Sequence, residues 1–144
     1  MTVLYLVDTD WVIYYLKGRR PFVERLRVLR DQGLAISVIN LGELYEGVSG
    51  ATEPEKREQG LKNFLQGVTI LGLDEETCRI FGKERQRLRR AGNLPGDIDL
   101  FIGATALRHN LTVLTNNRNH FERIEGLRIE ALPSVPQKCR LACR

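Results

Sequence analysis

The chain has 144 residues, of which 42% are hydrophobic and 28% charged, a composition that excludes a disordered or fibrous protein and fits one globular domain. Its formal net charge is +4, a mild basic excess that suits a polyanionic partner. The three cysteines include no Cys-x-x-Cys pair, which argues against a disulfide framework and against a zinc site. The first residues lack the basic start of a signal peptide and the length of a membrane span, so we expect a cytoplasmic protein that does not enter a membrane.

Strand and helix patterns alternate along the first half of the chain. Short apolar runs predict strands at 2–7 and 34–37. Thr9 is a candidate cap for the helix that follows the first strand, and Gly18 is a candidate residue to end it. Apolar residues at helical spacing predict three further helices, at 21–32, 38–48 and 55–66.

The second half of the chain continues this alternation. Asp74 is positioned to cap a long helix, and Gly92 to end it. We expect a loop or short helix after Thr115 and a poorly ordered tail at 134–144, which leaves a domain at 1–133. The predicted elements are a strand at 68–73, helices at 75–91 and 98–109, and strands at 111–115 and 127–132.

Strands separated by helices predict a three-layer α/β/α sandwich around a central, mostly parallel sheet. In such sheets, ligands bind outside the carboxyl ends of the strands. Asp8 ends the first predicted strand, and Glu43 lies in the helix after the second. Asp97 and Asp99 begin the helix that leads into the fourth strand, and Asn117 follows that strand. One edge of the sheet could therefore collect all of these side chains.

The stretch "GDIDLFIGATAL" places two carboxylates at the start of an apolar helix. Asp97 could simply be the N-cap, with Asp99 favoured in the first turn by the helix dipole. Asp8 could likewise be a cap, and Glu43 a surface acid. Taken together, several carboxylates without histidine or cysteine are typical of a Mg²⁺ or Mn²⁺ site, and such a site can hydrolyse phosphoesters.

Four segments carry a resemblance to a known family: "YLVDTDWVIYYLKG", "INLGELYEGV", "GDIDLFIGATALRHNLTVLTNNRNHF" and "RIEGLRIE". In this order they resemble the PIN-domain ribonucleases of the VapC toxin type, over residues 3–132. The resemblance implies an endoribonuclease toxin of a type II toxin–antitoxin system. It also implies a Mg²⁺ cofactor that Mn²⁺ can replace, a cognate antitoxin and a homodimer.

The resemblance also implies the site residues. Many family members have an aspartate where this chain has Asn117, so one position of the site is neutral here. Asp8 and Asp99 are the expected metal ligands, and the four catalytic positions are Asp8, Glu43, Asp99 and Asn117. Possible auxiliary residues are Asp97, Thr9 and Thr115.

Two surfaces could serve binding. Lys83, Arg87 and Arg90 form one stripe of the long helix, which is either a solvated face or a set of contacts to RNA phosphates. Trp11, Tyr14 and Tyr15 are aromatic residues for which we expect either a core position or an exposed subunit interface.

Two alternative functions remain open from the sequence. The segment "LVDTDWV" matches the Asp-x-Asp motif of haloacid-dehalogenase-type phosphatases, in which the second acidic motif should end a strand. The predicted helix at 98–109 conflicts with that requirement. The other alternative is a non-catalytic PIN-like scaffold that binds RNA or a protein partner, for which the neutral Asn117 is the only support.

Overall fold

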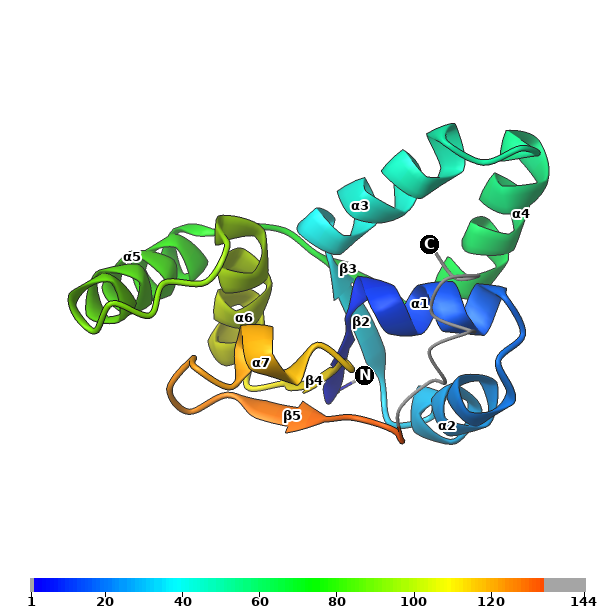
Figure 1. Cartoon of the computed structure of the whole chain (residues 1–144). Helices are drawn as coiled ribbons and strands as arrows, with labels where there is room; N and C mark the ends of the chain where they lie inside the picture. Colours follow the sequence, from blue (N-terminus) through cyan, green and yellow to red (C-terminus); the bar gives the residue numbers. More distant parts are fainter. Residues whose placement is uncertain (1, 134–144) are drawn as a thin grey trace.

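The structure is a computed structural model that describes residues 2–133; the predicted tail at 134–144 lies outside them. Parallel strands form one sheet in the order β3-β2-β1-β4-β5 (Figure 1). The strands are β1 (Tyr5–Val7), β2 (Leu34–Ser37), β3 (Thr69–Leu71), β4 (Thr112–Leu114) and β5 (Arg128–Glu130). The predicted α/β sandwich with a parallel sheet is confirmed.

The helices cover both faces of this sheet. The chain runs outward from β1 to β3 and then returns to β4 on the other side of β1, so right-handed crossovers place the two sets of helices on opposite faces. Figure 1 shows the sheet between these two layers. The first set is α1 (Thr9–Leu16), α2 (Arg20–Arg30), α3 (Val38–Ser49) and α4 (Pro54–Leu65). The second is α5 (Glu75–Arg90), α6 (Asp97–His109) and the short α7 (Arg118–Phe121).

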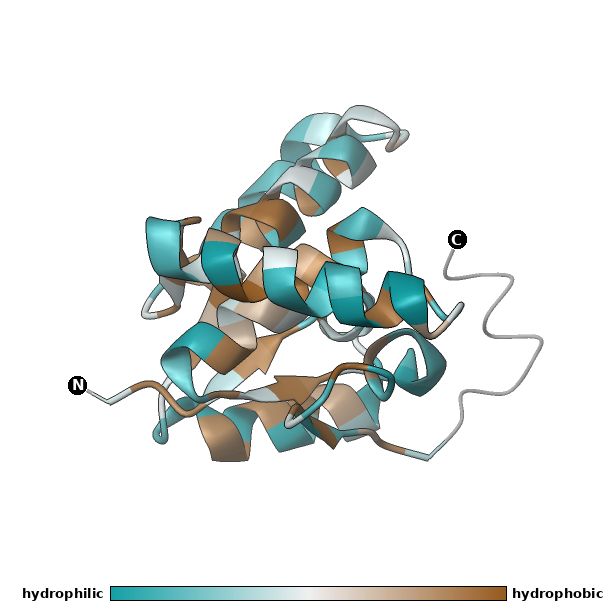
Figure 2. Cartoon of the chain, turned by 90° about the vertical axis from the view of Figure 1, so that its left-hand side faces the viewer, coloured by the Kyte–Doolittle hydropathy of each residue, from teal (hydrophilic) through white to brown (hydrophobic). Residues whose placement is uncertain are grey.

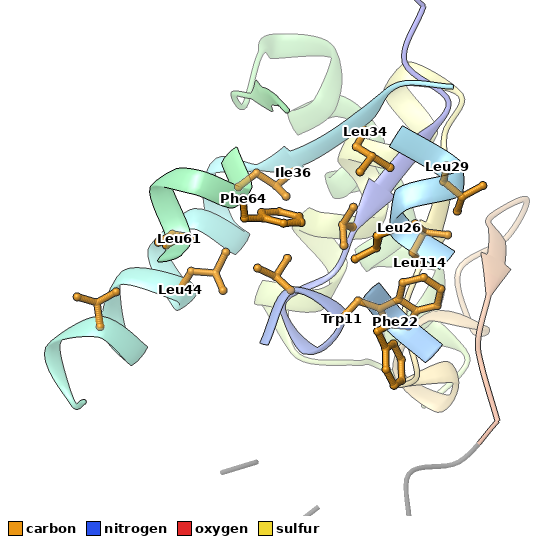
Figure 3. Packing of buried hydrophobic residues seen from close by; sticks show 13 residues of the cluster. Trp11, Phe22, Leu26, Leu29, Leu34, Ile36, Leu44, Leu61, Phe64 and Leu114 are labelled. Atoms are coloured by element: carbon orange, nitrogen blue, oxygen red, sulfur yellow. The ribbon is translucent and has the colours of Figure 1, made fainter. Parts of the chain in front are cut away.

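The strands alternate their side chains between two apolar clusters, as the period of two in a strand requires. Val7 and Leu114 face the first cluster, with Trp11 and Phe22 (Figure 3). Leu6, the neighbour of Val7, faces the second cluster. Figure 2 shows hydrophobic colour on strands inside the molecule and helices banded with hydrophilic and hydrophobic residues. No helix within residues 2–133 is long and apolar enough to cross a membrane.

Of the two positions expected for Trp11, the structure shows the core position and not an exposed interface. Its ring is fully buried, meets Phe22 edge-on at 5.4 Å, and donates from Nε1 to Asn116 Oδ1 at 3.0 Å. The helical position of Trp11 turns it toward the sheet, so it cannot contribute to a dimer interface. Tyr14 and Tyr15 are partly buried against the same cluster.

Most predicted element ends lie within two residues of those observed, but two predicted caps are wrong. Asp8, not Thr9, occupies the N-cap of α1, and Gly96, not Asp97, occupies that of α6. Neither helix receives a side-chain cap hydrogen bond: the Asp8 carboxylate bonds to Asn40 and Thr115 instead, and Gly96 has no side chain. The predicted cap Asp74 is confirmed by its 2.8 Å bond from the Thr77 backbone N–H.

Gly33 provides a test of how closely the chain packs before β2. Its φ is +92°, and an added Cβ would lie 2.3 Å from the Thr2 carbonyl oxygen. Gly67 has a similar φ of +77° but no neighbouring atom within 4 Å of such a Cβ. We expect Gly67→Ala to lower the free energy of unfolding by about 1–2 kcal/mol through backbone strain. Gly33→Ala should lower it further, because backbone atoms must also move. Urea unfolding of both variants measures the difference, and equal losses would contradict this packing.

Candidate active site

Asp8 occupies the place in the sheet where a ligand site is expected. It follows β1 directly, and β1 pairs with β4 where the chain changes the direction of its crossovers. Ligands of open parallel sheets bind at this switch point, beyond the carboxyl ends of the strands. The Asp8 backbone N–H still donates to the Leu114 carbonyl at 3.0 Å, which holds the residue against the end of β4.

The Asp8 carboxylate is buried and held by neutral donors. Its residue is 4% exposed; Oδ1 accepts from Asn40 Nδ2 at 3.1 Å and Oδ2 from Thr115 Oγ1 at 2.7 Å. Burial, together with the charges of Glu43 and Asp99, raises the pKa of Asp8 from 3.8 to about 6, although the hydrogen bonds from the Thr115 hydroxyl and the Thr9 backbone N–H lower it. Within residues 2–133 no cation pairs with this buried carboxylate, which is a costly arrangement.

Asn40 connects Asp8 to the rest of the site. With Ser37 it forms the capping box that begins α3, in which Asn40 Oδ1 accepts from the Ser37 backbone N–H at 3.1 Å. This fixes the amide so that Nδ2 donates both to Asp8 and to Thr9 Oγ1, each at 3.1 Å. The start of α3 is thereby locked to the start of α1.

Glu43 lies one turn further along α3. Its Oε1 accepts from Thr9 Oγ1 at 2.7 Å. Partial burial raises the pKa of Glu43, the Thr9 hydrogen bond lowers it, and the negative charge of Asp99 raises it. Thr9, which follows Asp8 in the chain, therefore links the start of α1 to Glu43 through its hydroxyl.

Asp99 lies in the first turn of α6, where Oδ2 is 2.9 Å from Nδ1 of His120 on α7. Its charge acts on both Asp8 and Glu43, so the structure brings these acids into one electrostatic site. Within residues 2–133, no three His, Cys, Asp or Glu side chains are already arranged as the ligands of one metal ion. The acids would therefore have to draw closer to a cation that binds there.

The structure separates Asp97 from this site. Its Oδ1 is 2.9 Å from Arg85 Nε on α5, and its side chain is 57% exposed. Asp97 and Asp99 also begin a helix rather than end a strand, which is the wrong context for the phosphatase motif. Asn117 is joined to the site through its backbone. Its N–H donates at 3.0 Å to Oγ1 of Thr115, the residue whose hydroxyl bonds to Asp8.

The sequence argument missed contacts made by three residues near the site. Asn40 could have been found from its Ser-x-x-Asn spacing, which resembles a capping box. Asp10 appeared only in the phosphatase motif, yet its partly buried carboxylate accepts from the Trp11 and Asn116 backbone N–H groups at 2.8 and 2.9 Å. Burial, followed by the charge of Asp8, raises the pKa of Asp10 to about 7. No spacing in the sequence indicated that His120 would meet Asp99.

The basic stripe of α5 is not uniform. All three residues are exposed, but Arg87 is held by Glu84 at 2.8 Å and lies 3.6 Å from Glu125, whereas no ion pair is found for Lys83 or Arg90 among the described residues. The pair between Arg85 and Asp97 places this part of α5 beside the N-terminus of α6, near Asp99.

Comparisons with known proteins agree with this geometry. The PIN domain family matches residues 5–127. Ribonuclease VapC1 of Methanocaldococcus jannaschii is 39% identical over 126 residues, covering 86% of this chain and 85% of that relative. Ribonuclease VapC2 of Haemophilus influenzae is 35% identical over 127 residues, covering 88% and 96%. The crystal structure of VapBC2 from Rickettsia felis bound to a promoter DNA fragment has a chain that is 30% identical, with a TM-score of 0.84 over 90% of this chain and 99% of that one. The chain therefore belongs to the PIN-domain family, and within it to the VapC ribonucleases.

Proposed function

We propose that this chain is an endoribonuclease toxin that hydrolyses RNA phosphodiester bonds with Mg²⁺, or Mn²⁺ in its place, held by Asp8 and Asp99, with Glu43 completing the site. Ribonucleases of this family are generally metal-dependent. The observation that carries the proposal is the buried Asp8 carboxylate, whose hydrogen-bond donors among the described residues are all neutral and which has two acids nearby. A divalent cation would offset this repulsion.

The donor set suits such a cation. Carboxylate oxygens are the ligands that Mg²⁺ and Mn²⁺ prefer, and an ionised carboxylate has about four acceptor sites, more than the donors around Asp8 use. When bound, the cation would lower the pKa of a coordinated water and stabilise the leaving oxygen. The protein's part is to fix the acids: Asn40 and Thr115 hold Asp8, and Thr9 holds Glu43. Asn117 adds no charge, so we propose one strongly held cation.

The proposed partners follow from the relatives. The Rickettsia felis structure is a VapBC2 assembly, and we propose that a cognate antitoxin binds this chain in the same way. A homodimer is also part of the proposal, although Trp11 cannot supply its interface. If the chain were instead a non-catalytic scaffold, calorimetric titration would detect no Mn²⁺ binding at the acids.

The raised pKa values predict how stability depends on pH in the absence of metal. Asp8 and Asp10 titrate near 6 and 7 in the folded protein but near 3.8 when unfolded. Between pH 4 and 7 the folded state holds more protons, so the free energy of unfolding should fall as pH rises through this window. Asp74, whose pKa is lowered to about 2, acts below this window. Urea unfolding in EDTA at several pH values measures the trend, which Asp8→Asn should weaken. Stability that rises with pH would contradict it.

Asp99→Asn tests the cation site. Loss of a ligand's hydrogen-bond partner typically costs about 10–100-fold in affinity or activity, so loss of a ligand charge should reduce RNA cleavage by more than about 100-fold. Metal-free stability should stay equal or rise, because one repelling charge is removed. Added Mg²⁺ should raise the melting temperature less than in the wild type.

Asp97→Asn is the matched control, since Asp97 lies two positions away on the same helix and pairs with Arg85. It should retain cleavage and the Mg²⁺ response. An Asp99→Asn protein that is destabilised but fully active would contradict the assignment of Asp99 as a ligand.

Substitutions in the basic stripe of α5 should have two different effects, one on RNA binding and one on stability. Replacing the exposed Lys83 and Arg90 with alanine should weaken RNA binding and reduce its salt slope by up to about 1.4, near 0.7 for each phosphate on a single strand. Arg87→Ala should instead lower stability, because it leaves the nearly buried Glu84 without its cation. Binding titrations over a range of salt, beside urea unfolding, separate the two. An unchanged slope in the double variant would identify the stripe as a solvated face.

A further inference from the structure

His120 is brought to the start of α6 by the packing of α7. Phe121, the next residue, is fully buried in the second apolar cluster, with Leu100 of α6. The His120 backbone N–H donates to the Asn117 carbonyl at 3.0 Å, which closes the turn of α7. These contacts leave the His120 side chain at the first turn of α6, with Nδ1 2.9 Å from Asp99 Oδ2.

The contact has a defined chemical form. A carboxylate only accepts hydrogen bonds, so the imidazole nitrogen that faces it must carry the proton. Nδ1–H therefore donates to Oδ2 of Asp99. Within residues 2–133, the other oxygen of Asp99, Oδ1, has no hydrogen bond or ion pair, so one oxygen is held and one is open.

Glu43 is held in the same way. Its Oε1 accepts from the Thr9 hydroxyl at 2.7 Å, and among the described residues no side chain bonds Oε2. In both acids, a side chain from another element donates a hydrogen bond to one carboxylate oxygen and so fixes its position. Hydrogen bonds of this kind orient carboxylates that bind metal ions.

We propose that His120 is a positioning residue of the cation site: its Nδ1–H fixes Oδ2 of Asp99 so that Oδ1 is presented to the cation. This inference rests on the proposed function. A polar contact between partly exposed side chains contributes little to folding, and the His120 and Asp99 side chains are 53% and 26% exposed. The effect of His120 should therefore appear in cation affinity rather than in metal-free stability.

The test is calorimetric titration of the full chain with Mn²⁺, beside the melting temperature in EDTA. In H120N the amide nitrogen is attached to Cγ, as Nδ1 is, so the donor to Asp99 is retained. In H120Q the amide nitrogen lies one atom further out, near the place of Nε2, and H120A has no donor. We expect H120A and H120Q to bind Mn²⁺ about 10–100-fold more weakly and H120N to bind like the wild type. All should melt near the wild-type temperature without metal.

His109 supplies the control, since the chain has only two histidines and His109 ends the same helix, about 15 Å from Asp99. H109A should bind Mn²⁺ normally. Unchanged or tighter binding by H120A, or equal losses in H120N and H120A, would overturn the positioning role while leaving the cation site intact. A wild-type chain that binds no Mn²⁺ would overturn the cation site, and this role with it.

Discussion

The burial of the Asp8 carboxylate is the constraint on which the rest of the site depends. A charge at the end of the central strand cannot be left without partners, and this chain satisfies it with two neutral donors, the amide of Asn40 and the hydroxyl of Thr115. Those donors come from α3 and from the end of β4. Holding one carboxylate in place therefore requires that both neighbours of β1 end at the same level of the sheet.

The parallel register provides this alignment. Val7 pairs with Leu114, so the residues after β1 and β4 emerge together, and Leu6 pairs with Ala35 of β2. The two apolar clusters fix the sheet between its helices and leave no freedom for the strand ends to separate. Stability from the packed core thus offsets the repulsion among the acids, as is common where function requires an unfavourable local arrangement.

Much of this architecture follows from the sequence. The alternation of strands and helices predicts the sheet, and the order of Asp8, Glu43 and Asp99 along the chain predicts their shared edge. Helix geometry explains why only one of the acids at the start of α6 faces this edge. Residues two positions apart point about 200° apart around a helix, so Asp97 turns to Arg85 when Asp99 turns inward.

The hydrogen bonds between elements could not be predicted in the same way. Whether Trp11 faces the sheet or solvent depends on how α1 rotates against α2, and the polar residues before it and apolar residues after it leave that open. The meeting of His120 with Asp99 depends on where α7 packs, and a four-residue helix carries no periodic pattern. Local spacing thus identifies the charged groups, whereas tertiary packing selects their partners.

The negative and positive charges of the molecule lie in separate places, at the acids and on α5. This separation would couple the binding of the proposed cation to the binding of RNA. Asp8, Glu43 and Asp99 form a negative site that would repel RNA phosphates, while the exposed Lys83 and Arg90 of the neighbouring α5 would attract them. A bound divalent cation reduces the repulsion at the acids without changing the attraction beside them. Coupling between two ligands is reciprocal. Bound RNA would therefore raise the affinity for the cation by the same factor by which the cation raises the affinity for RNA. In the proposed function, the acid cluster and the basic helix would therefore act on one substrate when the cation joins them.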